Sequence, residues 1–274
     1  MSPTVTGLFL YPVKGLRGFA VASMELDELG PVGDRRFLIV EESGRFLTQR
    51  SLPRMALVET ALSADSLTLS ARGAGAVSIA RAPDSAAPVR TVSVWKHEGL
   101  LAEDCGDAAA AWLSDFLEKR CRLVRAGTNF VRAVTKPAAQ PGDVFAFADA
   151  VPLLVISEAT LADLNDRIVA RGEEPVPMDR FRPNLVVGGC VASAEDTWPR
   201  FRAGEVAFRA AGPSIRCIVT TTDQQTGERG KEPLRTLASY RRAASDSADV
   251  LFGQNLIHET KRGTLRVGDA IAIL

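Results

Sequence analysis

The sequence predicts a strand-rich α+β fold, in which an antiparallel sheet or barrel dominates and a few helices pack against it. Short β-prone segments recur along the 274 residues, and segments with helical spacing of apolar residues are few. No regular alternation of strand and helix is present, which argues against a doubly wound nucleotide-binding sheet. A polar, proline-containing connection at residues 127–142 favours two domains, at residues 1–125 and 126–274.

Most of the first half is expected to form strands joined by turns. Residues 5–13 are apolar and β-prone, residues 37–40 follow a glycine turn, and residues 89–95 form another β-prone run. Residues 55–80 alternate between apolar and polar or small side chains, as antiparallel strands with one wet face do. Apolar residues recur at helical spacing over residues 107–120, which predicts the clearest helix of the chain.

The second half is expected to mix strands with two further helices. Residues 152–156 form a short apolar run that predicts a buried strand. Ser157 is placed to cap the N-terminus of a helix over residues 158–169, which has one apolar face. Further strands are expected after Asn184 and at residues 205–208, 218–222 and 264–274, with a short helix at residues 234–242.

Charge and hydropathy exclude several classes of protein. Lysine plus arginine equals aspartate plus glutamate, at 33 each, so no overall basic field points to a nucleic-acid partner. Residues 1–10 lack the basic and long apolar regions of a signal peptide. No stretch approaches the ~20 apolar residues that span a bilayer. The sequence therefore predicts a soluble, cytoplasmic protein with neither a nucleic acid nor a membrane as its partner.

The cysteine content argues against the common protein-held metal sites. The four cysteines are far apart and form no Cys-x-x-Cys pair, and the chain has two histidines. Such a set supplies neither a structural zinc site nor the usual four-thiolate iron–sulfur cluster. Free thiols in a reducing compartment fit this pattern best.

One of these thiols, Cys217, stands in the most informative stretch of the sequence. A β-branched run at residues 218–222 follows it, and Gly212-Pro213-Ser214 precedes it, so we expect Cys217 where a loop enters a strand. Such a position can aim a thiolate into a cleft, and Arg216 beside it would attract an anionic ligand. The alternative is a buried, inert cysteine that acts as a small apolar residue.

Two other positions offer cations at the ends of expected strands. Lys14 precedes Gly15, which places an ammonium beside exposed backbone amides and suits a phosphate; the alternative is a solvated lysine in a turn. Arg182 precedes a proline, so its backbone is expected to be extended. Asn184 supplies an amide that can both donate and accept hydrogen bonds. Arg182 is therefore either an edge charge in solvent or a contact to a ligand.

The order of several short motifs resembles the MOSC family of molybdenum-cofactor proteins, in the branch of the mitochondrial amidoxime-reducing component and its bacterial relatives. The Cys217 stretch, Arg-Cys-Ile-Val-Thr-Thr-Thr-Asp, is followed by Lys-Glu-Pro-Leu at residues 231–234. Phe-Arg-Pro-Asn at residues 181–184 and Phe-Gly-Gln at residues 252–254 add to it. Each motif is weak alone, but their order is specific, and the resemblance covers most of the chain.

The resemblance implies a β-rich MOSC N-terminal domain with a barrel-like module at residues 1–125, then a MOSC β-barrel at residues 126–274, with the cofactor between them. The expected cofactor is molybdenum bound to molybdopterin, with Cys217 as the metal ligand and catalytic residue; pyridoxal phosphate is not expected. Asp223 would orient a substrate or relay protons, or it caps a turn. The positions that match cofactor contacts are Lys14, Gly15, Arg35, Arg182, Asn184, Ser214, Arg216 and Asn255.

The implied activity is reduction of small N-hydroxylated compounds, such as hydroxylamines, amidoximes and N-hydroxylated bases, by a molybdenum-dependent oxidoreductase. Electrons would come from a separate donor protein, a ferredoxin or a b-type cytochrome with its reductase. Two alternatives from other classes stay open. The chain could carry or store the cofactor without turnover, or it could transfer sulfur through a persulfide on Cys217.

Overall fold

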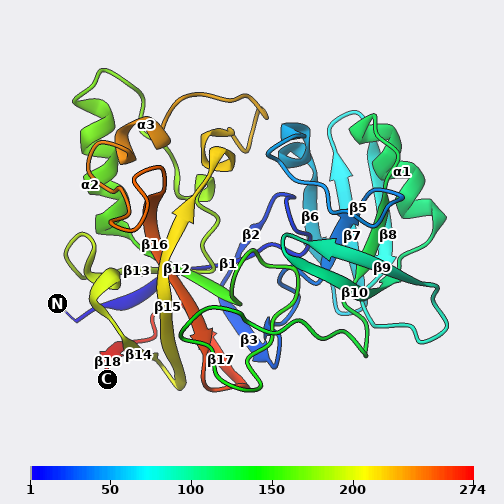
Figure 1. Ribbon diagram of the computed structural model, residues 1–274, viewed down its shortest axis with the longest axis horizontal. Coiled ribbons are helices and arrows are strands. Elements are labelled where there is room, and N and C mark those ends of the chain that lie inside the picture. Colours follow the sequence, from blue (N-terminus) through cyan, green and yellow to red (C-terminus); the bar gives the residue numbers. More distant parts are fainter. Residues whose placement is uncertain (1) are drawn as a thin grey trace.

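The computed structural model describes residues 2–274 and has two lobes (Figure 1). One lobe is built on an eight-stranded sheet and is called the large-sheet lobe below. The small-sheet lobe is built on a four-stranded and a three-stranded sheet. Strands predominate and the helices are few, which confirms the predicted β-rich α+β fold.

The large sheet combines strands from both ends of the chain. In spatial order it consists of β18 (Ile271–Ile273), β14 (Arg200–Ala203), β15 (Val206–Arg216), β16 (Val250–His258), β12 (Leu153–Ser157), β13 (Leu185–Gly188), β1 (Thr4–Leu10) and β2 (Phe19–Val21). One end of the sheet, β18, meets β1 near the other end, because the Ile271 amide donates to the Pro3 carbonyl at 2.8 Å and Thr4 bridges to Ala270. The sheet therefore curls toward a barrel around buried side chains such as Leu8 and Phe208.

A three-stranded sheet also joins the chain ends. It contains β17 (Gly263–Arg266), β3 (Ser23–Asp27) and β4 (Gly30–Pro31). Together with β1, these pairings place the first thirty or so residues against strands of the second half, as Figure 1 shows for β1 and β3. The domain boundary at residues 125 and 126 stays a prediction.

The small-sheet lobe has its own apolar core. Its strands are β5 (Phe37–Val40), β11 (Arg122–Arg125), β10 (His97–Asp104) and β9 (Val89–Val94) in one sheet, and β6 (Glu59–Leu62), β7 (Ser66–Ala71) and β8 (Gly75–Ala80) in the other. Helix α1 (Asp107–Leu117) buries Leu113 and Leu117 against this lobe. Its two aromatic residues, Trp112 and Phe116, stack on each other and belong to the same cluster.

Two further helices cover the large-sheet lobe. Helix α2 (Glu158–Val169) begins where the sequence predicts, because the Ser157 hydroxyl accepts a hydrogen bond from the Thr160 amide at 3.1 Å. Helix α3 (Leu234–Leu237) is shorter than the predicted helix at residues 234–242. Four short 3₁₀ helices complete the list: η1 (Pro53–Leu57), η2 (Met178–Arg180), η3 (Ala194–Thr197) and η4 (Ile218–Thr221). Among residues 2–274, no helix combines the length and the apolar character that crossing a bilayer requires.

The stretch around Cys217 differs from the prediction. Residues 218–222 are not a strand: most of them form the turn η4, in which the Thr220 and Thr221 hydroxyls donate to the carbonyls three residues earlier. Such local bonds compete with strand pairing in spite of the β-branched composition. The expected break at Pro213 lies inside β15, where the register shifts on both sides of Pro213. Cys217 therefore follows a strand instead of preceding one.

Replacing Ser157 with alanine is expected to destabilise the protein by about 1 kcal/mol without changing its fold, because the N-terminus of α2 loses its cap. The measurement is the free energy of unfolding in urea. Ser247→Ala is the control, since this side chain is exposed and is expected to change stability by less than about 0.5 kcal/mol. Equal stabilities of the two variants would contradict a capping role for Ser157.

Candidate functional site

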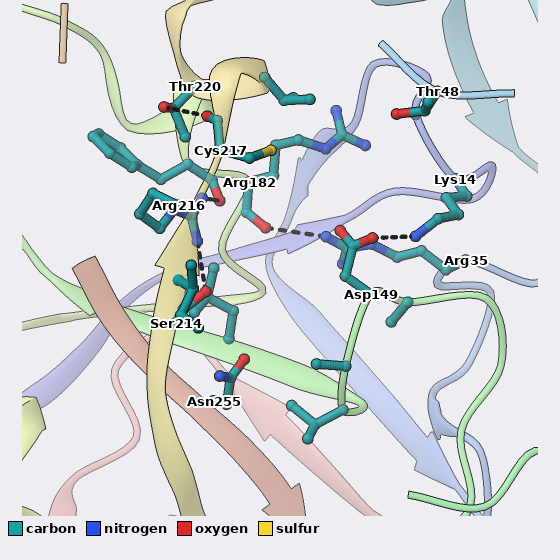
Figure 2. A pocket seen from close by; sticks show the side chains of 18 of the residues that line it. Lys14, Arg35, Thr48, Asp149, Arg182, Ser214, Arg216, Cys217, Thr220 and Asn255 are labelled. Carbon is teal, nitrogen blue, oxygen red and sulfur yellow. Dashed lines mark hydrogen bonds and ion pairs between the residues drawn. The ribbon is translucent and has the colours of Figure 1, made fainter. Parts of the chain in front are cut away.

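A cleft of about 320 Å³ opens where the two lobes meet. The small-sheet lobe contributes the segments around Gln49 and Trp95, and the large-sheet lobe contributes β15, the turn after it and Asn255. The segment at residues 148–154, which leads into β12, also lines the cleft. The candidate site is therefore assembled from segments that are far apart in the sequence (Figure 2).

The cleft brings together all but one of the residues that the sequence singled out. The predicted residues that line it are Lys14, Gly15, Arg35, Arg182, Asn184, Ser214, Arg216, Cys217 and Asn255. The exception is Asp223, which is not among the lining residues. Its carboxylate accepts hydrogen bonds from the amides of Gln225 and Thr226 and pairs with Arg180 at 2.8 Å. The structure thus places Asp223 as a turn cap, the alternative that the sequence left open.

Cys217 lies at the end of β15, where the chain leaves the sheet. The strand pairing ends at Arg216, and the Cys217 carbonyl then accepts hydrogen bonds from the amide and hydroxyl of Thr220. These bonds fix the backbone on both sides of the thiol, which is partly exposed to the cleft. None of the other three cysteines is among the lining residues. Desolvation raises the pKa of the half-buried Cys105 thiol to about 12, so that thiol stays protonated.

Arg35 lines the cleft and, in contrast to the two arginines described next, has an acidic partner. It donates to both carboxylate oxygens of Asp34, at 2.9 and 2.8 Å, and to the amide oxygen of Asn184 at 3.0 Å. The Asn184 amide group in turn donates to the Phe9 carbonyl at 3.2 Å. This chain of bonds fixes the Asn184 side chain at the edge of the cleft.

Arg182 is a half-buried cation without an anionic partner among the described residues. No carboxylate among residues 2–274 forms an ion pair with it, and its Nη2 atom is buried without a hydrogen-bond partner. Its guanidinium lies 4.4 Å from the centre of the Tyr11 ring. Burial, together with the nearby Arg35 charge, lowers the pKa of Arg182 to about 10.

The backbone of Arg182 is left-handed, with φ of 58°, and not extended as its position before a proline predicts. Two contacts account for this difference. The Arg182 carbonyl accepts a hydrogen bond from Arg35 Nη2 at 3.1 Å, and its guanidinium rests on Tyr11. Non-glycine residues in this conformation concentrate at functional sites, where the surrounding structure holds them.

Arg216 is the second half-buried cation of the cleft that lacks an acidic partner in the described part of the chain. It donates to the Ser214 hydroxyl at 2.9 Å and to the Phe181 carbonyl at 2.6 Å, both neutral acceptors, while its Nε atom has none. Burial lowers the pKa of Arg216 to about 10 as well. Desolvated charges without partners are costly, so these two guanidiniums indicate a site for an anionic ligand.

Gly15 and Asn255 shape the walls of the cleft. Gly15 has φ of 84°, a conformation that favours glycine, and a Cβ atom there would lie 2.8 Å from the Met55 methyl group. Its carbonyl accepts a hydrogen bond from Gln49 at 2.7 Å. Asn255 is buried and donates to the Pro213 carbonyl at 3.1 Å, which ties β16 to the irregular part of β15.

Sequence reasoning missed the partners of Lys14. The Lys14 ammonium forms an ion pair with Asp149 at 2.5 Å, and the Trp95 indole donates to the same carboxylate oxygen at 2.9 Å. Burial lowers the pKa of Lys14 to about 8, although Asp149 acts in the opposite direction. Arg132, fully buried, holds the segment before Asp149 by donating to the carbonyls of Ala146 and Ala148.

Comparison with known proteins gives matches along nearly the whole chain. The MOSC N-terminal beta barrel domain matches residues 2–120, and the MOSC domain matches residues 142–272. The chain is 36% identical to the mitochondrial amidoxime-reducing component 1 of Homo sapiens, over 99% of this chain and 83% of that protein. It is 33% identical to the mitochondrial amidoxime reducing component 2 of the same species, over 98% and 82%. It is 32% identical to the molybdenum cofactor sulfurase of Danio rerio, over 96% of this chain and 33% of that protein.

Proposed function

The chain belongs to the family of MOSC-domain proteins, and from this premise we propose that it is a molybdenum-cofactor-dependent reductase of small N-hydroxylated compounds. One observation carries the proposal: a thiol and two half-buried guanidiniums without acidic partners among the described residues line the same cleft. The names of its relatives, two amidoxime-reducing components and a molybdenum cofactor sulfurase, support the same substrate and cofactor.

The residues of the cleft fit molybdopterin. This group carries a phosphate, and the guanidiniums of Arg182 and Arg216, which line the cleft, would gain an anionic acceptor from it. A soft thiolate such as that of Cys217 suits a sulfur-rich metal shell. No group of three or more His, Cys, Asp or Glu residues within residues 2–274 could hold a metal ion. A metal at Cys217 would therefore take its other ligands from the cofactor.

Each residue of the cleft has a definable task in this proposal. When bound, the cofactor would supply redox-active molybdenum for oxygen-atom transfer chemistry. Cys217 would hold the metal, and Arg182 and Arg216 would hold the phosphate. Reduction of an N–OH group to N–H consumes two electrons and two protons and releases water. Lys14, with its pKa lowered to about 8, holds a proton at Nζ that it can give up near neutral pH.

We expect the purified protein to reduce an N-hydroxylated substrate with dithionite-reduced viologen, but not with NADH or NADPH alone. The sequence contains no Gly-x-Gly-x-x-Gly motif for a nicotinamide or flavin site, and its dispersed cysteines do not form a four-thiolate cluster. Electrons would then come from a separate ferredoxin or b-type cytochrome with its reductase. Such redox complexes bury less than ~1,200 Å² and dissociate readily.

The test uses protein produced in a host that makes the cofactor. Molybdenum content is measured by elemental analysis, and turnover is measured with each electron donor. Rapid turnover with NADH alone would rule out the need for a separate donor. Bound molybdenum without turnover under either condition would favour a cofactor carrier. A persulfide on Cys217 in protein that takes up no molybdenum would favour sulfur transfer.

A further inference from the structure

Asp149 is an acidic residue in a cleft whose other charged lining residues are all cationic. Among the described residues that line the cleft it carries the only carboxylate. The cationic lining residues are Lys14, Arg35, Arg50, Lys136, Arg180, Arg182 and Arg216. A carboxylate repels a phosphate at close range, so Asp149 does not help to bind the proposed cofactor. Asp149 is therefore suited to another ligand, one that a carboxylate would bind. The chemistry of a lone acid in such a site points to a ligand with hydrogen-bond donors or a positive charge.

One oxygen of the Asp149 carboxylate is free to bind such a ligand. Oδ1 accepts hydrogen bonds from Lys14 Nζ at 2.5 Å and from Trp95 Nε1 at 2.9 Å. Oδ2 accepts none from residues 2–274, and 75% of the side chain is exposed. A carboxylate offers about four lone-pair sites, so roughly half of its capacity is unused. In Figure 2 one oxygen of Asp149 is bonded to Lys14 while the other points away from it.

The carboxylate is held in place from two sides. Arg132 donates to the carbonyls of Ala146 and Ala148, which fixes the backbone just before Asp149. Trp95, which donates to the side chain, is itself packed edge to face on Phe46, with ring centres 4.8 Å apart. The Lys14 ammonium beside the carboxylate keeps the pKa of Asp149 well below its usual range. Asp149 is therefore an ionised acceptor with a fixed direction.

We propose that Asp149 Oδ2 binds an N–H group of the substrate, so that the cleft selects N-hydroxylated amidines and guanidines over simple hydroxylamines. This inference rests on the proposed function, because it concerns the substrate of the same cleft. Amidoximes and N-hydroxyguanidines carry a second nitrogen, with N–H donors, on the carbon that bears the N–OH group. The amidine product is also a planar cation, which makes a charge-assisted hydrogen bond to a carboxylate.

The direct test compares two ligands of nearly equal shape. Benzamidine is cationic and offers N–H donors on both nitrogens, whereas benzamide is neutral and presents an oxygen in place of one of them. Calorimetry on the wild-type protein, with and without its cofactor, is expected to show tighter binding of benzamidine. Asp149→Asn should weaken benzamidine binding roughly ten- to a hundredfold, the range of a charge-assisted hydrogen bond, and change benzamide binding little.

A matched control removes the same charge elsewhere. Asp115→Asn alters an exposed carboxylate on α1, outside the cleft, and should leave both affinities unchanged. Asp149→Ser provides a second variant if Asp149→Asn folds poorly. In the loaded enzyme, Asp149→Asn should lower kcat/KM for benzamidoxime more than for phenylhydroxylamine, which lacks the second nitrogen.

The outcomes separate this inference from the proposed function. Equal affinity of the wild-type and Asp149→Asn proteins for benzamidine would overturn the role of Asp149, and so would a wild-type protein that does not prefer benzamidine to benzamide. The binding measurement needs no turnover. If benzamidine binds through Asp149 but the protein takes up no molybdenum, the proposed reductase is wrong and the amidine site stands.

Discussion

The Cys217→Ala variant is expected to lose its molybdenum-dependent turnover while its fold and stability are unchanged. Metal-ion catalysis contributes several kcal/mol of transition-state stabilisation, so loss of the protein ligand should lower kcat by roughly a thousandfold or more. The thiol is only partly buried, at the end of β15, and the hydrogen bonds from Thr220 go to the Cys217 carbonyl and not to the Cys217 side chain. Removing the sulfur atom therefore costs little folding free energy.

The measurement combines molybdenum content, turnover with a reduced viologen and the melting temperature. Cys105→Ala is the matched control, because this thiol lies outside the cleft and its raised pKa keeps it protonated. That variant is expected to change the packing around residue 105 and to keep full activity per bound molybdenum. Wild-type activity in Cys217→Ala would exclude Cys217 as the metal ligand.

The second large effect is expected from Arg182. Arg182→Ala should weaken retention of the cofactor roughly ten- to a hundredfold, because a charge-assisted contact from a desolvated site contributes about 1.5–3 kcal/mol. Arg182→Lys should recover part of this loss, since an ammonium lacks the planar fork of the guanidinium. Equal cofactor occupancy in all three proteins would exclude Arg182 as a main contact.

The cofactor-free protein should respond differently to the loss of this charge. Arg182→Met keeps a long apolar side chain against Tyr11 but removes a half-buried cation that has no acidic partner in the described chain. We expect this variant, without cofactor, to melt at least as high as the wild-type protein. Arg167→Met is the control: Arg167 also lies over a tyrosine ring, at 4.1 Å from Tyr240, but is paired with Asp163 on the surface of α2. The Arg167→Met variant should leave cofactor retention unchanged.

The sequence predicted the residues of the cleft that stand in recognisable motifs. Arg216 and Cys217 are neighbours, and Arg182 and Asn184 flank a proline, so each pair is visible as a short pattern. The partners of Lys14 carry no such signal. Asp149 stands between two alanines in a segment without a motif, and Trp95 lies in a turn between β9 and β10. Their contact arises from the packing of the two lobes, which no local pattern records.

The wrong local predictions have a common physical origin. The β-branched residues after Cys217 favour a strand, but their hydroxyl groups bond to nearby carbonyls and close a turn. Pro213 favours a break, yet β15 accommodates it by shifting register against β16. Arg182 should be extended before Pro183, and tertiary contacts hold it left-handed. In each case bonds formed in the folded protein outweigh a local preference of about 1 kcal/mol.

The position of β1 in the large sheet has a consequence for the order in which the molecule is built. This strand is synthesised before the other strands of the sheet, but it pairs with β13, and Thr4 bridges to Ala270, more than 250 residues later in the sequence. Contacts between such distant positions form slowly, because a long loop must close before they stabilise anything. Lys14 and Gly15 follow β1 directly and line the cleft. We therefore expect the cleft to take shape only after the strands of the second half have been synthesised, so that any cofactor is inserted into a folded protein.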